Sequence, residues 1–333
     1  MDSHALQQAL LRTIRENLPT HLSAADEIAR ILEISTDSAY RRLRGEKSLS
    51  LDELLRLCAH FHISLDQLTD NQTGAFVFRG NLIDPATFRF DAYVQGMIRD
   101  LTYFNGFAQR EIYYLCKDIP IFHHYLFREI AAFKRFFWLK TYLQFPEYRD
   151  RRFRFEDYPD SLFRQEMQVL ELYNRMTSYE LWNVESMNIL IRQIEFYRNS
   201  QVFESDRDAL TLYQLAGQLI DHLEAQAALG FKFAYGDPER TPLGAFHMYF
   251  NEVFLGDNNI LVILDGVKMS LLTHTTVNYM ATRDLAFNEN MYRHISNLMK
   301  RSTLISSVSE RERSRFFRIL KEKIQHRREA LGG

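Results

Sequence analysis

One short stretch of the chain, from Ile34 to Lys47, concentrates side chains that can donate hydrogen bonds and neutralise negative charge. Guanidinium and ammonium groups bind phosphate oxygens, and the guanidinium fork also matches paired acceptors on a flat ring edge. The stretch is therefore suited to a surface that is anionic and also offers hydrogen-bonding groups. Its candidate contact residues are Thr36, Asp37, Ser38, Tyr40, Arg41, Arg42, Arg44 and Lys47.

The order of residues in this stretch predicts a short capped helix. Ser35 can accept a hydrogen bond from a free amide of the first turn, Asp37 lies where the helix dipole favours a negative charge, and Gly45 ends the run. Ala39 and Leu43 are four residues apart, so they share one face and are expected to point inward. The candidate contact residues then spread over the remaining surface of the helix.

A second short helix is predicted directly before the first, over SAADEIARILE. Ser23 is its expected cap, and the turn that joins the two helices is Glu33-Ile34-Ser35. The apolar stripe of this second helix consists of Ile28, Ile31 and Leu32. The two helices and their turn therefore form one compact motif.

This layout resembles the helix-turn-helix of the lambda-repressor-like (Xre-type) DNA-binding domains. The similar features are a small Ala29 where two helices cross, an apolar Ile34 in the turn and a second apolar position at Ala39. The resemblance continues into residues 48–68, which look like the fourth and fifth helices of that five-helix fold, and it covers about residues 5–70. It implies double-stranded DNA as the partner.

The resemblance also implies a role for each candidate residue, because the helix from Thr36 to Arg44 would enter the major groove. The expected base contacts come from Thr36, Asp37, Ser38 and Arg41, and the expected phosphate contacts from Arg42, Arg44 and Lys47. Tyr40 would contact a phosphate through its hydroxyl or a thymine methyl through its ring.

Two positions depart from the family pattern. Glu33 stands where the family usually has Gly, so a left-handed turn residue would carry a β-carbon at a cost of about 1 kcal/mol. Arg42 stands where many relatives carry an apolar residue, and Leu43 takes over the inward role one position later.

The overall composition limits how the chain could bind nucleic acid. The net charge is −2, so attraction to DNA must come from a local patch, which we place at residues 41–47. Acidic residues outnumber basic ones within residues 1–70, which predicts modest non-specific affinity and a need for a homodimer. With 333 residues we expect a DNA-binding domain over 1–70, a linker over 71–87 and a sensor or dimerisation domain over 88–333.

The remaining composition indicates a cytoplasmic protein. Cys58 and Cys116 each lie in an apolar pattern and are expected to be reduced core residues. The first residues lack the pattern of a signal peptide, and no stretch is apolar for long enough to span a membrane. We therefore expect no membrane partner.

Beyond residue 88 the pattern predicts a mainly α domain, a bundle or a stack of helical hairpins, with a small antiparallel sheet near residues 231–274. Asp265-Gly266 between two apolar runs is the clearest hairpin signal. Apolar residues at helical spacing predict helices over 92–107, 110–117, 121–143, 161–176, 184–199, 206–229, 284–301 and 309–328. The last helix is basic, and it is interpreted either as a source of phosphate contacts or a dimer seam, or as an ordinary terminal helix with solvated charges.

Other chemistry finds little support in the sequence. Glycine-rich phosphate loops and metal-ligand spacings are absent, so we expect no cofactor, no metal and no enzyme activity. The sequence thus predicts a DNA-binding transcriptional regulator whose large domain dimerises or senses a small-molecule, peptide or protein effector. The alternatives are a protein- or peptide-binding scaffold that uses the N-terminal module for protein interaction, and an enzyme whose catalytic groups are not visible in the sequence.

Overall fold

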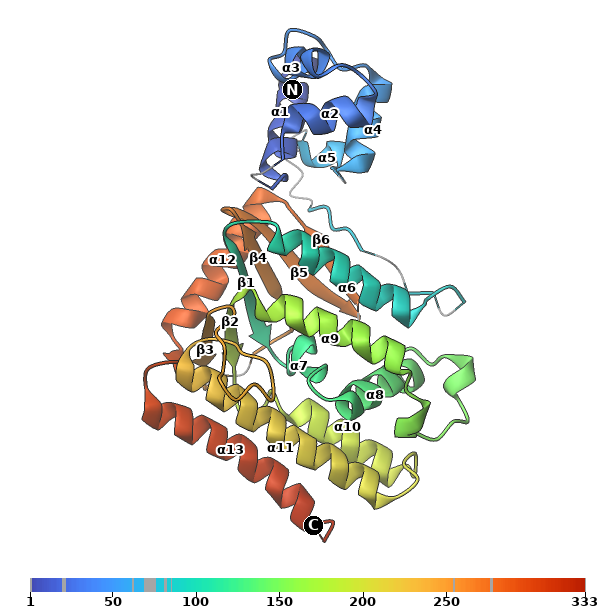
Figure 1. Ribbon diagram of the computed structural model, residues 1–333, viewed down its shortest axis with the longest axis vertical. Helices are drawn as coiled ribbons and strands as arrows, with labels where there is room; N and C mark the ends of the chain where they lie inside the picture. Colours follow the sequence, from blue (N-terminus) through green and yellow to red (C-terminus); the bar gives the residue numbers. More distant parts are fainter. Residues whose placement is uncertain are drawn as a thin grey trace.

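The computed structural model describes residues 2–19, 22–61, 63–68, 76–80, 83–84, 86–253, 255–275 and 278–332. Figure 1 shows a small helical bundle at one end and a larger part in which helices surround a sheet. Within the described residues, no helix combines the length and the apolar character needed to cross a bilayer.

The small bundle, here called the N-terminal bundle, contains five helices, as the sequence predicts. Its core is a separate cluster that includes Leu10, Ile14, Ile28, Leu43 and Leu57. Ser50 accepts a hydrogen bond from the amide of Glu53 and thereby begins the fourth helix. The helices are α1 (Ser3–Glu16), α2 (Ala24–Leu32), α3 (Thr36–Leu43), α4 (Leu51–His60) and α5 (Leu65–Leu68).

The larger part corrects the predicted fold class. It is an α/β fold with a seven-stranded mixed sheet, and not a mainly α domain with a small antiparallel sheet. The strand order is β6-β5-β4-β1-β2-β3-β7, in which β1, β2 and β3 run parallel to each other and the outer pairs are antiparallel. The strands are β1 (Arg110–Cys116), β2 (Thr177–Trp182), β3 (Phe246–Phe250), β4 (Ile260–Leu264), β5 (Val267–Thr275), β6 (Asn278–Thr282) and β7 (Thr303–Leu304).

Helices cover the two faces of the sheet unequally. Alternate residues of β1, such as Ile112 and Tyr114, join the main core with most of the helices, whereas Tyr113 and Leu115 join a smaller core with α12 (Leu285–Lys300). Figure 1 shows α12 lying apart from the other helices. The helices of the main core are α6 (Phe90–Asn105), α7 (Ile121–His124), α8 (Arg128–Phe137), α9 (Asp160–Asn174), α10 (Asn188–Asn199), α11 (Asp206–Leu229) and α13 (Glu310–Glu329).

The predicted hairpin at Asp265-Gly266 is confirmed. Both residues have positive φ, 45° and 87°, as the type I′ turn requires, and they join the antiparallel strands β4 and β5. By contrast, the helix predicted over residues 110–117 is wrong, because this segment is the central strand β1. Residues 184–187 precede α10, so the helix predicted from Val184 begins later.

The described part of the predicted linker contacts the α/β part, as expected for its apolar residues. The rings of Phe76 and Phe78 both pack against Phe287 in edge contacts. Arg79 forms a bridge with Ala281 on β6 through hydrogen bonds in both directions. Residues 71–75, 81, 82 and 85 of the predicted linker lie outside the described residues.

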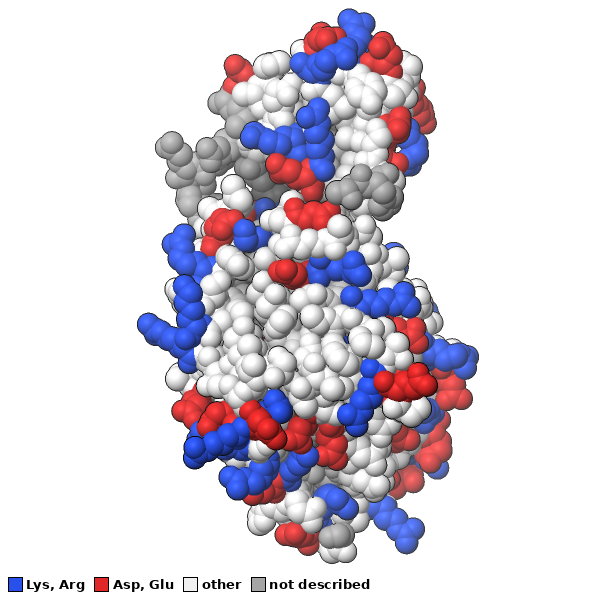
Figure 2. All heavy atoms as spheres, turned by 60° about the vertical axis from the view of Figure 1, so that its left-hand side comes forward, with Lys and Arg blue, Asp and Glu red and all other residues white. Residues whose placement is uncertain are grey.

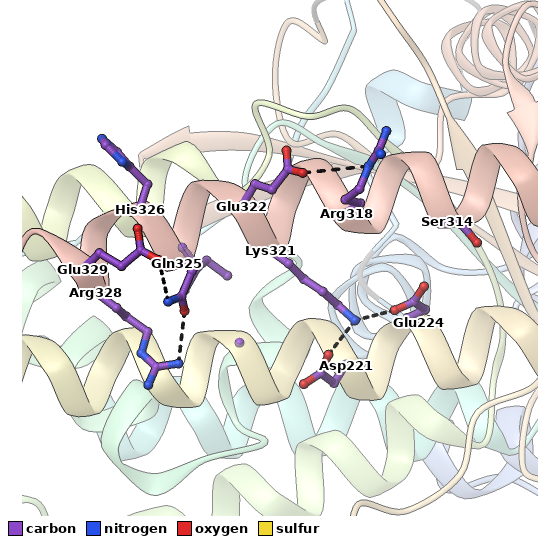
Figure 3. A pocket seen from close by; sticks show the side chains of 12 residues that line it. Asp221, Glu224, Ser314, Arg318, Lys321, Glu322, Gln325, His326, Arg328 and Glu329 are labelled. Carbon is purple, nitrogen blue, oxygen red and sulfur yellow. Dashed lines mark hydrogen bonds and ion pairs between the residues drawn. The ribbon is translucent and has the colours of Figure 1, made fainter. Parts of the chain in front are cut away.

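The basic terminal helix α13 packs as an ordinary terminal helix, which is the second of the two interpretations of that segment. Phe316, Phe317, Leu320 and Ile324 are buried in the main core. Figure 3 shows α13 beside α11, where Lys321, at the flank of the buried face, points toward α11 and pairs with Asp221 and Glu224 at 2.7 and 2.6 Å. Much of the basic excess of α13 is therefore balanced by its own neighbours.

Candidate nucleic-acid interface

Helix α3 begins and ends as its sequence predicts. The side chain of Ser35 accepts a hydrogen bond from the amide of Ser38, and Asp37 lies in the first turn. Ala39 and Leu43 are buried in the core of the N-terminal bundle. After the helix, Gly45 adopts a φ of 80°, which a residue without a side chain accepts readily.

The turn before α3 contains the predicted strained residue. Glu33 has φ 57° and ψ 43°, which is the left-handed conformation that favours glycine. The amide of Ile34 donates to the carbonyl of Ala29 at 3.0 Å and closes the end of α2. The end of α2 is thus closed by a backbone hydrogen bond in spite of the β-carbon at Glu33.

Most of the candidate contact residues lie on the exposed side of α3. Tyr40 is 47 % exposed, and the side chains of Arg41 and Arg44 are 53 % and 55 % exposed. In Figure 1 this helix lies at the end of the N-terminal bundle farthest from the sheet. The exposed or partly exposed candidates are Thr36, Asp37, Ser38, Tyr40, Arg41, Arg44 and Lys47.

A single carboxylate balances the two exposed arginines. Glu46 pairs with Arg44 at 2.6 Å and lies 3.8 Å from Arg41. The hydrogen bond from Arg44 holds the pKa of Glu46 below its ordinary value. Because these groups are in contact with water, a phosphate can replace Glu46 without leaving a buried charge unpaired. Figure 2 shows this alternation of basic and acidic side chains over the bundle.

Arg42 is the one candidate whose predicted role the structure contradicts. Its side chain is 3 % exposed, it pairs with Glu53 at 2.5 Å, and it also donates to the carbonyl and hydroxyl oxygens of Ser38. Because a buried and fully paired guanidinium is not available to a phosphate, Arg42 instead connects α3 to α4. A paired charge thus occupies this position in the interior of the bundle.

Gln7 is a supporting residue that sequence reasoning missed. Its amide nitrogen donates to the carbonyls of Arg42 and Lys47 at 3.0 and 2.9 Å, and its carbonyl accepts from the amide of Leu49 at 2.8 Å. Gln7 is 4 % exposed and lies on the buried face of α1 with Leu10 and Ile14. The sequence does contain a signal for this role, because Gln7 is a polar residue at an inward position of α1 and a buried amide requires hydrogen-bond partners.

The α/β part contains a second concentration of ionisable groups, but these are buried. The carboxylate of Glu180 accepts from Trp182 at 2.8 Å and from Tyr173, and it lies 3.0 Å from Nε2 of His123. Burial opposes its charge, yet His123 and the other partners hold the pKa of Glu180 below its ordinary value. No group of three or more metal-binding side chains is gathered among the described residues.

Lys232 belongs to the same buried cluster. Its ammonium group donates to the carbonyl of Tyr173 and the hydroxyl of Ser178 at 3.2 and 3.0 Å. It also lies 4.1 Å from the centre of the Tyr173 ring. Burial lowers the pKa of Lys232 to about 7. Because these groups satisfy one another in the interior, the cluster holds strands and helices together rather than presenting an open site.

Comparisons with known proteins find a family match in the N-terminal part of the chain. Residues 7–92 match the BetR domain, a family of helix-turn-helix-like DNA-binding domains. No curated protein and no solved structure matches the chain. The finer Xre-type resemblance remains a prediction. The matched residues include most of α1 and the whole of α2 to α5, so this part of the chain is similar to a DNA-binding helix-turn-helix domain with a regulatory role.

Proposed function

We propose that this protein is a sequence-specific transcriptional regulator that reads DNA with α3. The observation that supports this most directly is the placement of Tyr40, Arg41 and Arg44 on the exposed side of a capped helix, at the outer end of the bundle. The match to a DNA-binding family gives independent support. No enzymatic role is part of the proposal.

The proposal gives each candidate residue of α3 a separate role. Thr36, Asp37, Ser38 and Arg41 remain the candidates for base edges; the first three lie in the first turn of the helix that would enter the groove, and Arg41 lies in its last turn. Arg44 and Lys47 follow at its end and are proposed to contact phosphates, and Tyr40 remains a candidate for a phosphate or a thymine methyl. Arg42 is removed from the list of contacts, since it is buried against Glu53.

A second copy of the protein is part of the proposal for an electrostatic reason. One bundle offers few exposed cations on this surface, and Glu46 already balances two of them. Each phosphate neutralised adds to affinity through released counterions, so a single bundle would bind weakly. A homodimer would place two α3 helices about 34–36 Å apart on a near-palindromic site. The α/β part would pair the two bundles and respond to an effector.

The test is DNA binding by the full chain, measured by fluorescence anisotropy with fragments from the region upstream of its own gene. Arg41→Ala should weaken binding by roughly 5- to 150-fold, because a bidentate contact to guanine contributes about 1–3 kcal/mol. Lys47→Ala should weaken binding to all DNA sequences alike. It should also reduce the slope of log affinity against log salt concentration by about one, because one phosphate contact is lost. Arg318→Ala is the matched control, since this arginine is 70 % exposed on α13.

The pattern across the three variants decides the assignment. Unchanged affinity for Arg41→Ala and Lys47→Ala, with folded protein, would end the case for α3 as the reading helix. An equal loss for Arg318→Ala would mean that general charge, and not α3, dominates the binding. Sequence-specific binding by a species with the mass of a monomer would contradict the proposed homodimer.

A further inference from the structure

A recess in the α/β part lies where two helices begin. Helices α6 and α9 run side by side and start at the same end of this part of the molecule (Figure 1). They also end together, because the side-chain amide of Asn105 at the end of α6 donates to the carbonyl of Leu172 on α9 at 3.1 Å. The recess has a volume of about 400 Å³, which is within the range of small-molecule sites. Its wall includes Phe90, the first residue of α6, and Ser161 in the first turn of α9.

Arg135 of α8 lines this recess and brings its guanidinium group close to both helix starts. The central carbon of the group lies 5.5 Å from the centre of the Phe90 ring and 5.8 Å from the centre of the Tyr158 ring, which precedes α9. Nε of Arg135 is buried, whereas the two terminal nitrogens reach solvent. Within the described part of the chain the guanidinium group forms no hydrogen bond and no ion pair, so a partly buried cation is available to a ligand.

The carboxyl groups around the recess do not balance Arg135. Asp91 pairs with Arg89 at 3.2 Å, and the side chain of Glu147 is exposed to solvent. Burial raises the pKa of Glu166 to about 7, although its hydrogen bond and the charge of Arg135 oppose this, so Glu166 carries only part of a charge near neutral pH. A ligand with one negative charge would therefore balance Arg135, whereas a second negative charge would be repelled by Asp91 and Glu147.

The start of α9 supplies a second group that suits an anion. No side chain caps this helix, and the amide of Ser161 in its first turn has no acceptor among the described residues. The positive end of the helix dipole adds to the attraction. Arg128 holds this turn in place, because it donates to the carbonyls of Phe155 and Tyr158 and pairs with Asp160. An anion at this turn would therefore meet a donor whose position is fixed.

We propose that this recess binds a small organic monocarboxylate, whose carboxylate accepts hydrogen bonds from the terminal nitrogens of Arg135 and from the amide of Ser161. The two donors of a guanidinium edge match the two oxygens of a carboxylate. Binding does not depend on the proposed function. If the chain is a regulator, this ligand is its effector, and α6 connects the recess to the N-terminal bundle, because the hydroxyl of Tyr103 donates to the carbonyl of Asn17 at the end of α1.

The test titrates the full chain with propionate at constant ionic strength. Calorimetry gives the affinity, and NMR of the chain labelled with ¹⁵N-serine gives the location, since the Ser161 amide signal is identified by its loss in Ser161→Ala. Propionate should shift this signal in a saturable way, with Kd in the millimolar range expected for so small a ligand. The amide of Ser205 is the internal control, because a capping box with Asp208 already closes the start of α11.

Two further probes test the chemistry of the ligand. Propionamide has nearly the same shape without the charge, and inorganic phosphate at pH 8 is mostly a dianion. Both should bind at least about 10-fold more weakly than propionate, which corresponds to about 1.4 kcal/mol. Equal binding of propionamide would overturn the role of charge, and tighter binding of phosphate would overturn the monocarboxylate class. The absence of a saturable Ser161 shift with propionate would overturn the site.

Three variants locate the binding to the recess. Arg135→Gln removes the unpaired charge and should weaken propionate binding by about 10-fold or more. Ser161→Asp places a competing carboxylate in the first turn of α9, where the helix dipole favours it, so this exposed substitution keeps the proposal testable if Arg135→Gln does not fold. Arg164→Gln is the matched control, because Arg164 is exposed on α9 and does not line the recess. Unchanged affinity in Arg135→Gln or Ser161→Asp would contradict the location, as would an equal loss in Arg164→Gln.

Discussion

The two parts of the molecule use charged side chains in opposite ways. In the N-terminal bundle the arginines assigned to DNA contact are exposed and pair with Glu46 in water. In the α/β part Glu180, Lys232 and Lys134 are at most 1 % exposed and are held by fixed partners. Exposed pairs exchange partners easily, whereas buried pairs cannot be separated without a large penalty. Under the proposed function, the exposed charges of α3 serve recognition, whereas the buried charges of the α/β part, like Arg42 in the bundle, serve structure.

The largest effect should follow from removing the central buried carboxylate. Glu180→Ala leaves His123, Tyr173 and Trp182 without their acceptor in the interior, so we expect the α/β part to lose about 3–5 kcal/mol of unfolding free energy. Urea denaturation followed by tryptophan fluorescence reports on this part, because both tryptophans lie in it. Glu185→Ala, at a 49 % exposed carboxylate paired with Lys323, should cost less than about 1 kcal/mol. Similar losses in the two variants would remove the contrast between buried and exposed charge.

The next effect is a change in stability with pH that depends on Lys232. Its pKa is lowered to about 7 in the folded protein, from an ordinary value of 10.5, because of burial. Between these values the unfolded chain binds more protons, so stability should rise with pH from about 7 to 10.5. The rise should be on the order of a few kcal/mol, since each pKa unit corresponds to about 1.4 kcal/mol.

Lys232→Met isolates this contribution from all other titrating groups. The difference in stability between wild type and variant should change with pH across that window, and it is measured by denaturation at several pH values. A difference that stays constant with pH would show that Lys232 keeps an ordinary pKa despite its burial.

A smaller effect should separate the buried arginine of α3 from its exposed neighbour. Arg42→Ala leaves Glu53 and the oxygens of Ser38 without their donor, so we expect a loss of about 1–3 kcal/mol in the N-terminal bundle. Arg44→Ala should leave stability nearly unchanged and should weaken only DNA binding. Hydrogen exchange of the amides of α2 and α4 measures local stability in the bundle. Equal protection in both variants would argue against a structural role for Arg42.

The smallest predicted effect is a gain in the stability of the N-terminal bundle. Glu33→Gly removes the β-carbon from a left-handed turn residue and should stabilise the bundle by up to about 1 kcal/mol. Gly45→Ala is the matched opposite, because its φ is 80° and an added Cβ would lie 2.6 Å from the His4 ring. Hydrogen exchange should therefore show slower opening in the first variant and faster opening in the second. A loss of stability in both variants would mean that the Glu33 side chain makes a compensating contact.

The sequence predicts the N-terminal bundle well because local signals determine it. Caps at Ser23 and Ser35, the strained turn at Glu33 and the inward Ala39 and Leu43 are all properties of neighbouring residues. The sequence does not predict the burial of Arg42, because its partner Glu53 lies on another helix. The sequence pattern could not show that a charged residue was buried when its compensation comes from a distant position.

The sheet was largely missed because its central strands are buried on both faces. In β1 the run from Ile112 to Cys116 is apolar throughout, so it lacks the alternation that distinguishes a strand from a buried helix. In β2 the charged Glu180 lies in the interior and contradicts the usual expectation for a strand core. The β4–β5 hairpin was predicted because its turn residues carry their own local signal.

The bridge between Arg79 and Ala281 has a consequence for the behaviour of this protein at high concentration. Strand edges with free amides and carbonyls attract strands of other molecules and favour aggregation. Here the segment entering the α/β part pairs with β6 at one margin of the sheet, and β7 at the other margin is only two residues long. Association between copies should therefore proceed through side-chain surfaces, and the folded protein should resist the formation of continuous intermolecular sheets.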